Sequence, residues 1–234
     1  SGGNLDLFAA ESFGQFYDHQ AASLLHGRLD VPKEALGEEA FVFEGKVYGY
    51  FGPTPALLRL PFSLAGAGFG RLSRVFMVAH LAACLAAAYA LLSHAARLLG
   101  GPAARPSRSH VVLLAGATGA GSSLFFLGSR AYVYHEAILC GAAFALWSVW
   151  ATLRWLHRGG EGAAWIAALL CGVLSVHARP PTGLFALATL GCAAGWLLVR
   201  KVSGPHRLRA SGIGRFAAVG LLAVLGVLSF NGLS

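Results

Sequence analysis

Side chains able to do acid–base chemistry are concentrated at the beginning of this chain. Eight of the ten acidic residues precede position 45. Asp18 and His19 fall in the first turn of a predicted short helix, where Asp18 could act as a general base beside an imidazole. An Asp at that position also commonly caps a helix or lies solvated, and this alternative stays open. Glu11 and Asp6 are chemically eligible as the base too.

A second polar group interrupts the apolar part of the chain. Glu136 falls inside an apolar run, where an ionisable side chain is costly and marks either a functional site or a paired structural charge. Arg130 is its nearest basic partner in the sequence, although six residues is a poor helical spacing. His135 could bind an anionic phosphate, or it could lie with Tyr132 and Tyr134 in an aromatic belt at the membrane interface.

A third group is Arg179, which is followed by Pro180 and Pro181 between two apolar runs. Irregular backbone near a membrane is tolerated where it lines a cavity. The guanidinium of Arg179 could then hold a lipid phosphate through paired hydrogen bonds. A tight external turn whose arginine reaches toward the lipid headgroups is the alternative.

Other signals argue against further classes of site. The stretch 116–123 has the glycine spacing of a phosphate-binding loop, but Ser122 stands where that loop needs a lysine, so we interpret its small residues as helix packing. The four cysteines lie singly in apolar runs, without metal-ligand spacing. We predict no metal and no cofactor.

The composition predicts a polytopic membrane protein of all-α class. The chain has 234 residues, of which 56% are hydrophobic and 12% charged, against roughly a quarter charged in soluble domains. Its net charge of +8 reports membrane orientation and not a nucleic-acid partner, because the basic residues fall in short loops. We predict six spans, at 75–96, 111–128, 131–156, 163–178, 182–199 and 216–230, several of them short.

The predicted domain organisation has three parts. Residues 1–54 form an acidic, water-exposed loop with an amphipathic helix at 16–28, on one side of which Phe13, Phe16, Ala21, Leu24 and Leu25 gather, and a hairpin around 41–48. Residues 55–70 form a juxtamembrane helix at the interface, too short to span and broken at Pro61. Residues 71–234 form the transmembrane bundle.

Orientation follows from the basic residues of the loops. Ten lie on one side of the predicted spans and only Arg130 and Arg179 on the other. The positive-inside rule puts the ten in the cytoplasm and the acidic N-terminal loop outside the cell. We therefore expect an integral protein of a bacterial inner membrane, with its unusual polar residues on the extracytoplasmic face.

Three stretches of the sequence carry a resemblance to a known family, AASLLHGRLDVP at 21–32, YFGPTPALL at 50–58 and FGRLSR at 69–74. With these stretches the chain resembles the GT-C superfamily of integral-membrane glycosyltransferases, such as protein O-mannosyltransferases and lipid A aminoarabinose transferases. The closing Phe230-Asn231-Gly232 is similar to the start of a later external loop in some members. On this view the chain is a fragment, which also fits its start at Ser-Gly-Gly without an initiator Met.

The resemblance implies an inverting transfer of a sugar from a polyprenyl-phosphate donor to an acceptor in the cell envelope. An acid of the first external loop would be the base, and Asp18 matches best, ahead of Glu11 and Asp6; many members carry an acidic pair nearer Glu11 that this chain lacks. The donor would be bound by His19, Arg130, His135, Glu136 and Arg179. The implied partners are membrane lipid, the polyprenyl-phosphate sugar and the acceptor. The alternative function is a non-catalytic transporter or scaffold subunit.

Overall fold

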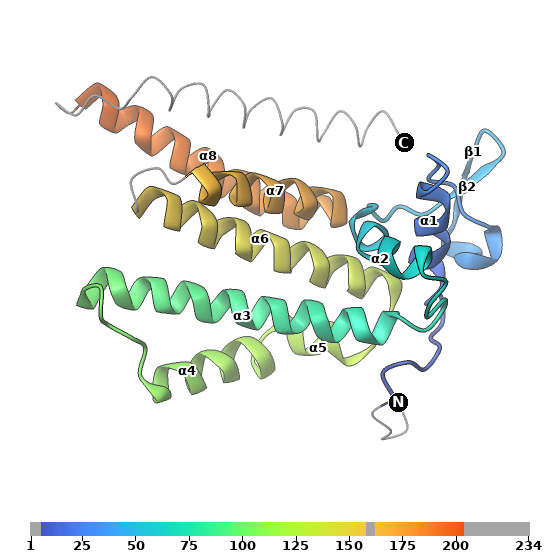
Figure 1. Ribbon diagram of the computed structural model, residues 1–234, viewed down its shortest axis with the longest axis horizontal. Coiled ribbons are helices and arrows are strands. Elements are labelled where there is room, and N and C mark those ends of the chain that lie inside the picture. The colour runs from blue at the N-terminus through green and yellow to red at the C-terminus, as the bar shows by residue number, and fades with distance from the viewer. Residues whose placement is uncertain (1–5, 158–161, 204–234) are drawn as a thin grey trace.

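Long helices make up most of the chain. The structure is a computed structural model that describes residues 6–157 and 162–203. Helices α3 (Ser73–Gly100), α6 (Val133–His157), α7 (Gly162–Ala178) and α8 (Pro180–Ser203) lie side by side, with α1, α2 and the strands gathered at one end (Figure 1). We call this end the head. The predicted helical class is thus observed, with few strands.

Two helices, α3 and α6, are long and apolar enough to cross a membrane, or three if a bent helix pair forms one span. Both match predicted spans to within four residues. Helix α7 is apolar but has only 17 residues. The predicted span at 216–230 lies outside the described residues. A membrane protein with two or three spans is therefore supported by length and composition among the residues described.

The predicted span at 111–128 is not one continuous helix. Helix α4 (Arg108–Ala115) passes into a π-helical turn at Gly116–Ala120, and α5 (Ser123–Ser129) follows after a bend of 57°. Ser122 caps α5 by accepting a hydrogen bond from the backbone N–H of Leu124. Small and hydroxyl residues thus break this helix, because they favour a new N-cap over continuation.

The head begins with α1 (Phe16–Leu24), four residues shorter than predicted. Gly27 adopts a left-handed φ of 69°, and the N–H of Arg28 bonds to the carbonyl of Ser23 at 3.0 Å, which closes the helix. Phe16 and Ala21 are buried as predicted, whereas Phe13 and Leu25 are exposed. The predicted apolar side was wrong for these two because Phe13 precedes α1 and Leu25 follows its last residue.

After α1 the chain forms two short 3-10 turns (Lys33–Ala35 and Gly37–Glu39) and then the hairpin of β1 (Phe41–Phe43) and β2 (Lys46–Tyr48). The hairpin was predicted. Its strands are antiparallel, with Val42 opposite Val47. Glu44 and Gly45 both have positive φ, as a two-residue hairpin turn requires.

Helix α2 (Thr54–Leu64) lies between the hairpin and α3. The predicted start at 55 agrees to within one residue, but the helix ends at Leu64, six residues before the predicted end. The predicted break at Pro61 was wrong, because the helix continues through Pro61 for three more residues. A proline inside a helix removes one backbone hydrogen bond. Here the helix is held by its packing, since Thr54, Ala56 and Arg59 are buried.

Two apolar cores hold the chain together. The first joins the head to α6 and contains Phe16, Tyr17, Leu36, Phe51 and Val133. The second lies near the opposite end between α6, α7 and α8, around Trp155 and Trp165. The head is therefore packed onto the helices by a core of its own.

Candidate functional site

The most concentrated group of polar side chains lies under the head and is centred on Arg59 of α2. Arg59 is fully buried. Its Nη1 lies 3.0 Å from Oδ2 of Asp18 on α1, and its Nη2 lies 2.7 Å from Oε2 of Glu136 on α6. One guanidinium thus joins carboxylates that are 118 positions apart in the sequence. We call Asp18, Arg59 and Glu136 the head triad.

Backbone and hydroxyl groups add hydrogen bonds to the triad, although the buried Nε of Arg59 has no hydrogen-bond partner among the described residues. Arg59 donates to the carbonyl of Gly14 at 3.2 Å and to the hydroxyl of Ser73 at 3.0 Å. Ser73 donates to the same Gly14 carbonyl at 3.1 Å. The N–H of Gly70 donates to Oδ2 of Asp18 at 2.8 Å. The start of α3 is therefore tied into the same network.

The surroundings of Arg59 favour the charged form of its guanidinium. Burial acts to lower the pKa of the guanidinium, but Glu136 and then Asp18 outweigh it and raise that pKa above its usual value. The rings of Tyr17 and Phe76 lie 5.4 and 5.3 Å from the guanidinium carbon, within cation–π range. A buried charge is tolerated when it is paired and hydrogen-bonded, as here.

Asp18, the predicted base, is 4% exposed in this arrangement. Both of its contacts go to Oδ2, and Oδ1 receives no hydrogen bond from the described residues. The sequence left open that Asp18 caps its own helix. It does not, because its carboxylate bonds to Gly70 and Arg59 and not to α1. Asp18 therefore links α1 to α2 and to the turn before α3.

Glu136 is the paired structural charge that the sequence allowed as one of two alternatives. Its partner is Arg59 and not Arg130. Arg130 is exposed and donates to the hydroxyl of Tyr132 at 3.3 Å. His135 is 2% exposed, and its Nδ1 bonds to the carbonyl of Arg130 at 3.0 Å. The imidazole thus holds the loop that leads into α6, among aromatic rings.

The remaining predicted residues of the head lie nearer the surface. Glu11 forms an ion pair with Arg74, both side chains being partly exposed. His19 packs edge-on against Phe69 with the ring centres 4.9 Å apart, and burial lowers its pKa although Asp18 acts in the opposite direction. His19 also lines a surface pocket of about 420 Å³ beside α1.

Arg179 is the single residue between α7 and α8, in the tight turn that the sequence allowed. Its carbonyl accepts a hydrogen bond from the Thr182 hydroxyl at 2.8 Å, in addition to those from the backbone N–H groups of Thr182 and Gly183. Its guanidinium is half-buried over the rings of Tyr50 and Phe51, at 5.6 and 5.9 Å. Among the described residues no carboxylate lies within ion-pair distance of it.

The predicted residues are thus brought to one end of the bundle but not into one cavity. Asp18 and Glu136 meet in the head triad, whereas Glu11, His19, His135 and Arg179 have separate contacts. Within ranges 6–157 and 162–203 no three His, Cys, Asp or Glu side chains are grouped to hold a metal ion.

Arg59 was missed as a site residue. Its sequence signal was the same as that of Glu136, a lone charge in an apolar helix, and opposite charges of that kind are expected to pair. Comparison with known proteins adds no further assignment, since no family model, curated protein or solved structure matches the chain.

Proposed function

We propose that this chain belongs to a membrane glycosyltransferase that transfers a sugar, with inversion, from a polyprenyl-phosphate donor to an envelope acceptor at the head end. The observation that carries the proposal is Arg179. It is a half-buried cation at the end of apolar helices, stacked on Tyr50 and without a described carboxylate partner. A lipid-linked sugar would bring its phosphate to this level of the membrane.

The phosphate of the donor would be bound by Arg179, with Arg130 on the loop before α6 and His135 in the first turn of α6. Guanidinium groups suit this task because they bind phosphate oxygens in pairs. Cations placed beside the departing phosphate also stabilise the charge that develops on it. The resemblance at 21–32, 50–58 and 69–74 supports the same class of reaction.

Asp18 is the proposed base, acting through Oδ1 while Oδ2 stays bound to Arg59 and the N–H of Gly70. The acceptor hydroxyl must come within hydrogen-bond distance of that oxygen, which requires the head to open slightly around α1. Glu11 is the next candidate, because it is more exposed than Asp18. The head would face outside the cell, and the membrane would be a bacterial inner membrane.

The test is a transfer assay with the purified full-length protein and a panel of labelled polyprenyl-phosphate sugars. Asp18→Asn and Arg179→Ala are compared with Glu38→Gln and Lys46→Ala, which remove one acidic and one basic charge from exposed positions of the head away from the triad and the turn. We expect turnover in the parent and both controls, a loss of at least about a hundredfold in folded Asp18→Asn, and weaker donor binding in Arg179→Ala. Turnover that survives in Asp18→Asn would move the base to Glu11 or Asp6.

A non-catalytic scaffold subunit or transporter is the second candidate, and burial of the head triad favours the scaffold. A carboxylate sealed against a guanidinium holds elements together without any substrate. No turnover with any donor, from a protein that remains folded, would favour this candidate over the glycosyltransferase.

A further inference from the structure

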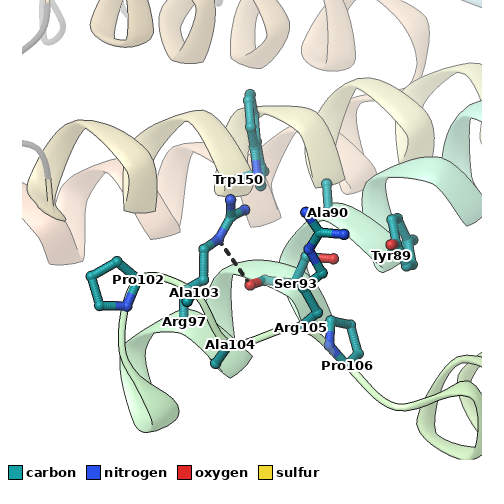
Figure 2. Close-up of a pocket in the computed structure, with 10 residues that line it drawn as sticks. All are labelled: Tyr89, Ala90, Ser93, Arg97, Pro102, Ala103, Ala104, Arg105, Pro106 and Trp150. Carbon is teal, nitrogen blue, oxygen red and sulfur yellow. Dashed lines mark hydrogen bonds between the residues drawn. The ribbon is translucent and has the colours of Figure 1, made fainter.

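A basic pocket lies at the end of the bundle opposite the head, between α3, α6 and the segment that connects α3 to α4. Its volume is about 560 Å³. Figure 2 shows Arg97 entering it from α3 and Arg105 from the connecting segment, with Trp150 of α6 on the far side. We call this the far pocket.

The far pocket is positively charged. Arg97 and Arg105 line it together with apolar and neutral side chains, and no acidic residue lines it. Arg97 directs its Nε to the carbonyl of Ser93 at 3.2 Å, and neither arginine forms an ion pair with a described residue. Two guanidiniums at one cavity would repel each other unless solvent or an anion lies between them.

An adjoining pocket of about 470 Å³ extends this charge. It shares Arg97, Pro102 and Trp150 with the far pocket and adds Arg154 with two histidines. The Arg154 guanidinium lies 5.3 Å from the centre of the Trp150 ring. The described acidic residues all belong to the head or to the start of α6, so Arg97 and Arg105 have no described acidic residue beside them.

Exposed apolar side chains lie on α3 near the far pocket. Tyr89, which lines the pocket, is 49% exposed, and Leu98 and Leu99 at the end of the helix are 50% and 91% exposed. Helix α3 is also one of the two helices long and apolar enough to span a membrane. A ligand that fits both features has an anionic head and an apolar tail.

We propose that the far pocket binds the phosphate headgroup of an anionic phospholipid, with Arg97 and Arg105 on the phosphate oxygens and the acyl chains along α3. Basic pockets between helices at the cytoplasmic side bind such headgroups, and the same arginines belong to the side that the positive-inside rule puts in the cytoplasm. If these arginines only set the orientation of the protein in the membrane, they would not need to line one cavity. The site is independent of the proposed transferase activity.

The experiment measures binding of the purified full chain in nanodiscs or detergent to phosphatidylglycerol, phosphatidylcholine and inorganic phosphate, by native mass spectrometry. We expect phosphatidylglycerol to be retained over phosphatidylcholine. Arg97→Gln and Arg105→Gln should each weaken retention about fivefold, since an arginine near a lipid surface contributes about 1 kcal/mol. Arg108→Gln is the control, because Arg108 is an exposed arginine three residues from Arg105 but outside the pocket.

Arg105→Gln keeps the test decisive if Arg97→Gln fails to fold, because Arg105 is exposed on a connecting segment. Equal retention of the two lipids by the parent would overturn the proposal. An equal loss in Arg108→Gln would do the same, since it would indicate general surface charge. Binding of inorganic phosphate without retention of phosphatidylglycerol would show that the pocket takes free phosphate and not a lipid.

Discussion

The two ends of the bundle hold their charges in opposite ways. At the head, Arg59 is fully buried between Asp18 and Glu136, and its hydrogen bonds go to other parts of the chain. At the far end, Arg97 and Arg105 line an open cavity and have no described carboxylate beside them. Arginine is thus buried and ion-paired at the head, whereas at the far end it lines an open cavity.

This difference indicates which charged residues mainly stabilise the fold and which are available to bind a ligand. A buried charge whose partners are all within the chain is costly to disturb, because removal of one partner leaves the others uncompensated. Substitution of an exposed cation at a cavity costs the protein little stability. Stability should therefore respond to substitutions in the head triad, and ligand binding to substitutions at Arg179 and in the far pocket.

The largest effect is expected from Glu136→Gln. The change leaves the buried Arg59 with one carboxylate in place of two, and loss of a buried partner costs about 3–5 kcal/mol. The matched control is Glu11→Gln, which breaks a partly exposed pair with Arg74 and should cost about 1 kcal/mol or less. Thermal unfolding in detergent compares them, and equal losses would mean that the buried pair is no more important than the surface pair.

A smaller effect is expected from Gly52→Ala, which tests how closely the head packs on α7. A Cβ at Gly52 would overlap the backbone carbonyl of His177, and a backbone atom cannot move aside like a side chain. The expected loss is about 1–3 kcal/mol. Gly191→Ala in α8 is the control, because a Cβ there meets nothing within 4 Å and alanine favours the helix. No loss in Gly52→Ala would show that the head is not held against α7.

The smallest effect is a dependence of stability on pH through His19. Burial lowers the folded-state pKa of His19 below its ordinary 6.5, so the unfolded state binds its proton first as the pH falls. Stability is then fully present above about pH 6.5 and declines as the pH falls toward the folded-state pKa. His19→Gln should flatten this decline in melting temperatures measured between pH 7.5 and 5.5; an unchanged slope would exclude His19 as the cause.

Local patterns in the sequence predicted the elements whose causes are local. The apolar runs around α3 and α6 predicted two long helices, and Glu44-Gly45 predicted the hairpin, because turn chemistry and helix length depend on neighbouring residues. The bend between α4 and α5 was missed, since a capping serine inside an apolar run was read as helix packing. Pro61 was read as a break, but tertiary packing around Arg59 outweighs its lost hydrogen bond.

The candidate site was predictable only in part, for a related reason. Asp18 and Glu136 were each recognised from their own surroundings. Their common partner Arg59 lies 77 positions from Glu136 and 41 from Asp18 in the sequence. No periodicity reports such a contact. Two opposite charges in separate apolar helices were the available signal, and only the fold shows that they meet.

The most direct measurement of the account is the unfolding free energy of Arg59→Met beside the triple variant Asp18→Asn, Arg59→Met and Glu136→Met, both in the full chain. If the head triad is a closed structural pairing, Arg59→Met alone leaves two buried carboxylates without a cation and should cost about 3–5 kcal/mol. The triple variant removes those charges as well and should recover much of that loss. A triple variant no more stable than Arg59→Met would contradict the account.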